Sequence, residues 1–181
     1  MDTMSIYTTT MQEPAGYEQY PIGYVICANL LSLSMYCIGA FLVYQLGPVW
    51  LILYILFILL LEFRLLSRHC MDCYYYGKTC AFGKGRLSGL LFSKGVPERF
   101  CQKKITWKNI VPDFLVFIIP ALIGIVILLI EFRLLILILI IVLLALGFLG
   151  NALVRGQLAC RYCKQRAIGC PAAQLFDKKS T

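Results

Sequence analysis

The chain has 181 residues, of which 60% are hydrophobic and only 14% are charged, and its formal net charge is +8. A soluble domain has about half of its residues apolar and about a quarter charged, so this composition excludes an ordinary water-soluble globule. With 14 glycines and 7 prolines, the chain also fits neither a collagen-like repeat nor a disordered tract. The composition therefore predicts an integral membrane protein.

Residues 1–21 read as a polar N-terminal tail. The first 20 residues contain no Lys or Arg, and their only charged side chains are Asp2, Glu13 and Glu18. A secretory signal peptide begins with a basic region, so this segment does not read as one. We expect the tail to be loosely ordered.

Two long apolar blocks follow, at 22–66 and 111–154, and each is about twice the ~20 residues that cross a bilayer as a helix. Lipid offers no partners to the backbone, so each block should fold as a helical hairpin. The first hairpin, 22–67, is predicted to turn at Gly47-Pro48 and the second, 111–155, at 131–133. The result is an all-α polytopic membrane protein with transmembrane helices at 22–46, 49–67, 111–130 and 134–155.

The basic residues predict the orientation of these helices. Ten of the 17 Lys and Arg residues lie between Arg64 and Lys108, and six lie between Arg155 and Lys179. The positive-inside rule then places the N-terminus, the basic Cys-rich loop 68–110 and the Cys-rich tail 156–181 in the cytoplasm, at a plasma or inner membrane. Because the charges lie close to helix ends, we assign them to topology and lipid headgroups and expect no nucleic-acid partner.

The spacing Cys-x2-Cys-x6-Cys occurs twice, once in 70–80 and once in 160–170. Each copy follows the second helix of a hairpin. The pattern predicts a duplicated unit, a transmembrane hairpin followed by a cytoplasmic cysteine lobe, with the two units arranged as parallel repeats.

The cysteines of these motifs are the candidate metal ligands, because stable disulfides are rare in the cytoplasm. A CxxC pair places two thiolates on one tight turn, and such thiolates suit an iron–sulfur cluster or zinc. Cys101 lies in the same basic loop as the first motif. The predicted ligands of the cofactor are therefore Cys70, Cys73, Cys80, Cys101, Cys160, Cys163 and Cys170.

Two arrangements of these ligands remain open. In the first, each motif holds its own centre, and the first motif completes a four-thiolate site with Cys101. The second motif would then have an open position, to be filled by His69 or a substrate. In the second arrangement, the two CxxC pairs share one site, formed by Cys70, Cys73, Cys160 and Cys163, and Cys80, Cys170 and Cys101 are left for a second site.

The function we expect is that of an iron–sulfur-binding membrane protein that relays electrons, or presents a cluster to a partner, at the cytoplasmic face. Its partners would be the lipid bilayer and an acidic soluble redox partner or another membrane subunit. One alternative is a non-catalytic scaffold or assembly subunit with structural zinc. Another is a membrane thiol–disulfide oxidoreductase. No residue is assigned a catalytic role.

Other residues carry weaker expectations. Cys27 and Cys37 should pack inside the bundle as small apolar residues. The run 74–76 of three tyrosines would either cover a cluster or lie in an interfacial belt. Polar side chains near the inner ends of the helices would either line a vestibule below the metal or sit at the interface: Asn29, Glu62, Arg64, Asp113, Asn151 and Arg155.

Overall fold

The computed structural model describes residues 16–102 and 107–170, and every regular element in these ranges is helical. The long helices are α1 (Ile22–Tyr44), α2 (Pro48–Leu65), α5 (Trp107–Ile130) and α6 (Leu134–Ala145). Three π-helical stretches extend two of them: η1 (Leu66–Cys70), η2 (Leu146–Gly150) and η3 (Ala152–Ala159). The short helices are α3 (Lys84–Leu91), α4 (Pro97–Gln102) and α7 (Lys164–Gly169).

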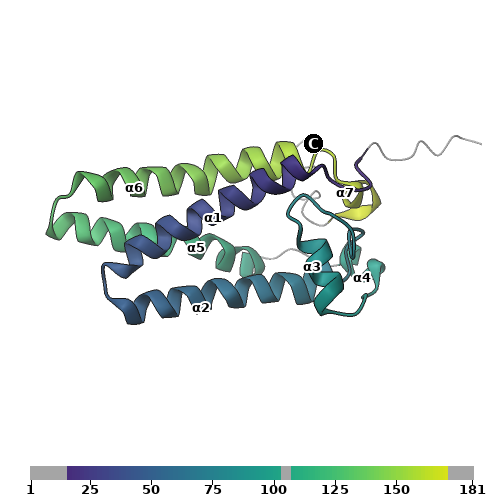
Figure 1. Cartoon of the computed structure of the whole chain (residues 1–181), viewed down its shortest axis with the longest axis horizontal. Helices are drawn as coiled ribbons and strands as arrows, with labels where there is room; N and C mark the ends of the chain where they lie inside the picture. The colour runs from purple at the N-terminus through teal and green to yellow at the C-terminus, as the bar shows by residue number, and fades with distance from the viewer. Residues whose placement is uncertain (1–15, 103–106, 171–181) are drawn as a thin grey trace, which may run out of the picture.

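The long helices form a bundle in which α1 crosses between the others (Figure 1). Four stretches are long and apolar enough to cross a membrane: Ile22–Tyr44, Pro48–Cys70, Val111–Ile130 and Leu134–Ala159. Only 11% to 28% of the residues in their most hydrophobic windows are buried inside the protein. Most of the apolar surface therefore faces outward, which is typical of helices that contact lipid. The prediction of four apolar helices is confirmed.

Both predicted hairpin turns are present. Gly47 has a φ of 118°, which favours glycine, and Pro48 begins α2, where its missing N–H removes no helical hydrogen bond. The second turn contains an ion pair between Arg133 and Glu131 at 2.7 Å. The fourth span continues as a π-helix to Ala159, beyond its predicted end at residue 155.

The core of the bundle lies between α1, α5 and α6. Its buried members are Met35, Leu42, Phe117, Ala121, Ile136, Ile140 and Leu143. Small residues let these helices approach closely, since a Cβ on Gly147 would lie 2.7 Å from the Phe117 ring. By contrast, Tyr54 is the one buried residue of α2, and its hydroxyl donates to the Val116 carbonyl at 2.8 Å.

The short helices α3, α4 and α7 gather at one end of the bundle, the end at which α1 begins (Figure 1). Both cysteine motifs lie at this end, because each follows a helix that runs toward it. We call this region the cysteine end. Residues 70–80 are the first cysteine segment and residues 160–170 are the second.

Candidate functional site

Both cysteine segments open with the same backbone turn. The Cys73 N–H donates to the Cys70 carbonyl at 3.4 Å, and the Cys163 N–H donates to the Cys160 carbonyl at 3.4 Å. The next turn repeats as well, since the N–H three residues on donates at 3.0 Å to the carbonyl of Cys73 and of Cys163. Each segment also follows a π-helical stretch, a local geometry that is frequent at functional sites.

The two segments lie against each other. Cys73 and Cys80 of the first and Cys163 of the second pack on one apolar cluster. The buried members of that cluster are Tyr20, Tyr75, Ala81 and Ala159. The tyrosine run therefore lies beside the cysteines, with Tyr75 only 2% exposed.

Electrostatics link the sulfurs of the first segment to the second. Burial, together with the neighbouring thiols Cys163, Cys70 and Cys80 when ionised, raises the pKa of the Cys73 thiol to about 12. A half-buried thiolate with other thiolates beside it is unfavourable without a cation.

The second segment behaves in the same way. Burial raises the pKa of Cys163, and the nearby thiols of Cys170 and Cys80 add to the effect. Burial also raises the pKa of Cys160, and the neighbouring Cys163 and Cys170 thiols raise it as well. All six motif cysteines therefore belong to one electrostatically connected group.

Backbone N–H groups approach three of these sulfurs. The Gly85 N–H donates to Cys80 Sγ at 3.3 Å. The Tyr75 N–H acts on Cys73, and those of Gln165 and Arg166 act on Cys163, in each case lowering the thiol pKa against the effect of burial. Hydrogen bonds of this kind stabilise the thiolate form, which is the form that binds a metal.

Cys101 joins the second segment rather than the first. Gln165 Nε2 donates to Cys101 Sγ at 3.9 Å, and a Cβ on Gly169 would lie 3.2 Å from the same sulfur. The Cys101 thiol thus lies against α7, near the residue that precedes Cys170. This position differs from the arrangement in which Cys101 completes the first motif.

The thiols are gathered but not arranged as a coordination sphere. Within residues 16–102 and 107–170, no three His, Cys, Asp or Glu side chains are placed so that they could hold a metal ion. All nine cysteines are free thiols. The motif cysteines thus provide neighbouring sulfurs, and backbone N–H groups point toward three of them.

The N-terminal residues 16–20 hold the two cysteine segments together, and we call them the N-terminal clasp. The Tyr17 N–H donates to the Tyr162 carbonyl at 3.1 Å in the second segment, and the Tyr20 N–H donates to the Thr79 carbonyl at 2.9 Å in the first. The Tyr20 hydroxyl also donates to the Ala159 carbonyl. This part of the tail is therefore not loosely ordered as we expected, whereas residues 1–15 lie outside the described residues.

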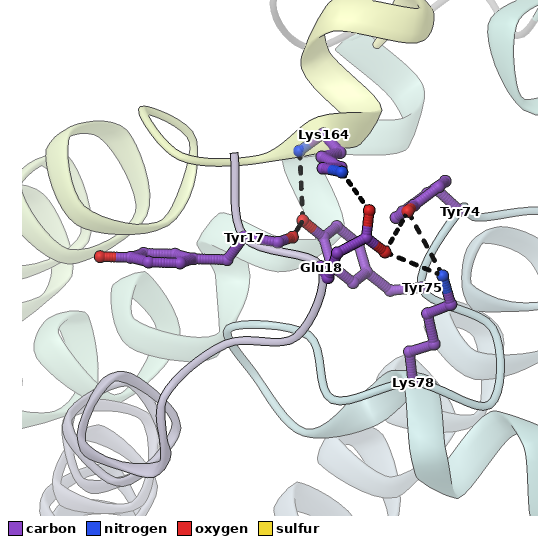
Figure 2. A network of polar contacts seen from close by, with 6 residues as sticks. All are labelled: Tyr17, Glu18, Tyr74, Tyr75, Lys78 and Lys164. Carbon is purple, nitrogen blue, oxygen red and sulfur yellow. Dashed lines mark hydrogen bonds and ion pairs between the residues drawn. The ribbon is translucent and has the colours of Figure 1, made fainter. Parts of the chain in front are cut away.

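Glu18 is the polar centre of the clasp (Figure 2). Its carboxylate accepts a hydrogen bond from the Tyr74 hydroxyl at 2.7 Å, and it pairs with Lys78 at 3.3 Å and with Lys164. Lys164, then Tyr74, lower the pKa of Glu18 to about 2. One carboxylate thus joins a lysine from each cysteine segment.

Tyr75 and Gln165 make the direct contacts between the segments. The Tyr75 hydroxyl donates to the Tyr17 carbonyl at 2.7 Å and accepts the Lys164 N–H at 3.1 Å (Figure 2). Gln165 is 3% exposed, and its Oε1 accepts the Tyr74 N–H at 2.7 Å. No sequence motif predicted this network. Its only signal was the glutamate between two tyrosines in Tyr17-Glu18-Gln19-Tyr20, directly before the first helix.

Some of the weaker sequence expectations were wrong. Cys27 and Cys37 are exposed on α1, so they do not pack inside the bundle. Asp113, for which the sequence left a vestibule or an interfacial position open, is exposed. In contrast, Asn29 and Glu62 line a groove between α1 and α2, close to the cysteine end.

Comparison of the chain with protein-family models, with curated proteins and with solved structures finds no match.

Proposed function

We propose that this protein is an integral membrane metal-centre protein whose clustered thiolates bind an iron–sulfur centre. It would relay electrons, or present the cluster to a partner, at the cytoplasmic face. The observation that carries this proposal is the juxtaposition of the two CxxC turns: Cys73 and Cys163 share one buried cluster and influence each other electrostatically. Neighbouring, partly buried thiols need a cation before several of them can ionise together.

Within this proposal, the two segments share a centre rather than holding one each. Cys73 senses Cys70 and Cys80 from its own segment and Cys163 from the other. We therefore favour Cys70, Cys73, Cys160 and Cys163 as the shared ligands. Cys80, Cys170 and Cys101 would be further ligands in this proposal.

The proposal also includes a duplicated architecture. The repeated spacing and the identical pair of turn hydrogen bonds support two parallel repeats, each a membrane hairpin followed by a cysteine lobe. The concentration of Lys and Arg at this end supports a cytoplasmic location, where the basic surface would attract an acidic soluble partner or anionic lipid.

Structural zinc is the second candidate. It is favoured by the same thiols and by the network around them, since Gln165 and Tyr75 tie the segments together as a small folded unit. A thiol–disulfide oxidoreductase is the third candidate, and it is less favoured because the thiolate is the reactive form and partial burial raises the pKa of Cys73 to about 12.

Metal analysis of anaerobically purified protein tests the proposal. We expect visible absorption that is bleached by dithionite, together with bound iron and sulfide. A colourless protein with stoichiometric zinc would replace iron–sulfur with the zinc candidate. A protein that binds neither metal, with titratable CxxC thiols, would contradict both.

The proposed orientation has a separate test. A protease added outside intact cells should leave the loop 68–110 uncut, whereas the same protease should cut it in inverted vesicles. Cleavage in intact cells would reverse the topology.

A further inference from the structure

The groove between α1 and α2 is lined by aliphatic side chains and by a smaller number of polar ones. It has a volume of about 770 Å³, within the range of small-molecule sites. Residues 82–84 and Leu87 cover its end nearest the cysteine end, and its polar lining residues are Asn29, Ser32, Tyr36, Glu62 and Lys84. The apolar lining residues include Ile26, Leu30, Leu33, Ile58, Leu59 and Leu87.

This groove opens toward the lipid. Leu30 and Leu33 on α1 are each 57% exposed, and Leu59 on α2 is 58% exposed. These residues lie within spans that are long and apolar enough to cross the bilayer. A ligand dissolved in the membrane could therefore enter sideways, with an apolar tail along these walls.

The covered end carries a small polar group. Glu62 accepts a hydrogen bond from the Tyr36 hydroxyl at 2.7 Å and forms an ion pair with Lys84 at 2.6 Å. An ammonium has three N–H donors, so Lys84 retains donors beyond the one directed at Glu62. The end of the groove can thus donate hydrogen bonds to a ligand head.

The charge of this end favours a neutral head over a phosphate. Lys84 is already paired with Glu62, and a phosphate placed beside Lys84 would face the Glu62 carboxylate at short range. A carbonyl oxygen accepts hydrogen bonds without adding a negative charge. A ring carbonyl with an apolar tail therefore matches the groove better than a phospholipid headgroup.

The polar end of the groove is also connected to the thiols. Lys84 lines the groove, and the next residue, Gly85, donates its N–H to Cys80 Sγ at 3.3 Å. Helix α3, which begins with Lys84, packs against η1, which ends at Cys70. A ligand head at Lys84 would therefore lie beside the candidate metal centre.

From this juxtaposition we infer that the α1–α2 groove binds a membrane quinone. The carbonyl of the quinone head would accept a hydrogen bond from Lys84, near Glu62 and Tyr36, and its isoprenoid tail would lie along aliphatic walls such as Ile58 and Leu59. The choice of a quinone among neutral amphiphiles rests on the proposed electron-relay function, because quinones are lipid-soluble electron carriers.

Photolabelling tests this inference on the full-length protein in phosphatidylcholine nanodiscs. The probe is an azido-quinone with two isoprene units, and labelled peptides are identified by mass spectrometry. We expect saturable labelling of peptides that contain Tyr36 or Lys84, competed by the unlabelled quinone. Labelling that does not saturate would overturn the inference. So would labelling that anionic phosphatidylglycerol displaces and the unlabelled quinone does not.

One variant and one control locate the site. Leu33→Trp fills the groove and should weaken labelling by about tenfold or more. Leu53→Trp is the control, since Leu53 is 52% exposed on α2 and does not line the groove. Because Leu33 lies at the exposed surface, its variant should fold, which circular dichroism would verify. Undiminished labelling in folded Leu33→Trp protein would overturn the site.

Metal content measured on the same samples separates this inference from the proposed function. Bound metal without saturable quinone labelling would overturn the quinone site alone. Saturable labelling of a protein that binds no metal would overturn the metal centre and leave the quinone site standing.

Discussion

The segment from Cys70 to Cys80 and the segment from Cys160 to Cys170 share a cysteine spacing, but the chain between the second and third cysteine folds differently in each. In the first, residues 74–79 form successive turns, and Cys80 is followed by α3. In the second, the same interval forms α7. The common part is the CxxC turn, with the same hydrogen bonds in both copies.

This difference makes the two segments complementary. The first supplies apolar cover, with Tyr75 buried against the cysteines. The second supplies polar bridges, since Gln165 receives the Tyr74 N–H and approaches Cys101. Two identical segments could not satisfy each other in this way, so we interpret the divergence as the reason that they form one unit. The following predictions test that interpretation.

The largest effect is expected from removing one thiol from either side. Cys73→Ser and Cys163→Ser should each lower metal affinity by more than about tenfold, because a shared centre would lose a ligand in both cases. Metal content of the purified variants is the measurement. Cys37→Ser is the matched control. Cys37 is exposed on α1, away from the two cysteine segments, so this variant should leave the metal content unchanged. Loss of only half of the metal in each variant would indicate two independent centres.

The next largest effect concerns the hydroxyl that joins the segments. Tyr75→Phe leaves the Tyr17 carbonyl and the Lys164 N–H without their partner, and an unsatisfied buried group costs about 1–3 kcal/mol. Thermal unfolding in detergent should show lower stability, with faster amide exchange at Lys164. Tyr44→Phe is the control because Tyr44 is exposed at 54%. Equal stability of the two variants would show that the segments are not joined through Tyr75.

A smaller effect is expected at Glu18, which pairs with both segments from the exposed surface. Its pKa is lowered from 4.5 to about 2, so its stabilising contribution is fully present above pH 4.5 and is lost as the pH falls toward 2. In wild-type protein, the protection of amides in residues 74–79 and 162–169, expressed relative to the intrinsic exchange rate at each pH, should decrease over that interval. Glu18→Gln should show this lower protection already at neutral pH. A variant that retains the wild-type pH profile would assign the acid response to another carboxyl group.

The smallest effect is expected in α3, the helix that follows the first segment. Within the described residues, Ser88 Oγ is the buried side-chain oxygen or nitrogen that lacks a hydrogen-bond partner. Ser88→Ala should therefore be neutral, or stabilising by up to about 1 kcal/mol, because it removes a desolvated hydroxyl. Thermal unfolding in detergent is again the measurement. A clear loss of stability would mean that this hydroxyl does bind a partner, and the cysteine end would be the first place to look for it.

Local sequence signals predicted the bundle well. Both apolar blocks fold as helical hairpins, which turn at Gly47-Pro48 and at 131–133 as predicted. These features depend on length, hydropathy and turn chemistry within a few residues, which is why they can be read from the chain alone. The packing expected of Cys27 and Cys37 was wrong, because periodicity on a uniformly apolar helix does not show which side faces lipid.

The sequence predicted which residues form the candidate site but not how they come together. The cysteine spacing identified the ligand candidates, yet it gave no indication that residues 16–20 would bind both segments. That clasp relies on contacts such as those of Tyr20 with Thr79 and Ala159, which are far apart in the sequence. Contacts of this kind leave no periodic pattern.

The sequence by itself determined that the chain carries four apolar spans and two matched cysteine motifs, because hydrophobic length and residue spacing act locally and need no partner. The tertiary structure decided that the motifs meet, that Glu18 and Tyr75 hold them together and that Cys101 joins the second segment. It also decided that Lys84 and Glu62 close a groove beside the thiols. Those outcomes depend on how separate segments pack at the end of the bundle. The favourable free energy of that packing comes from many contacts between residues that are far apart in the sequence.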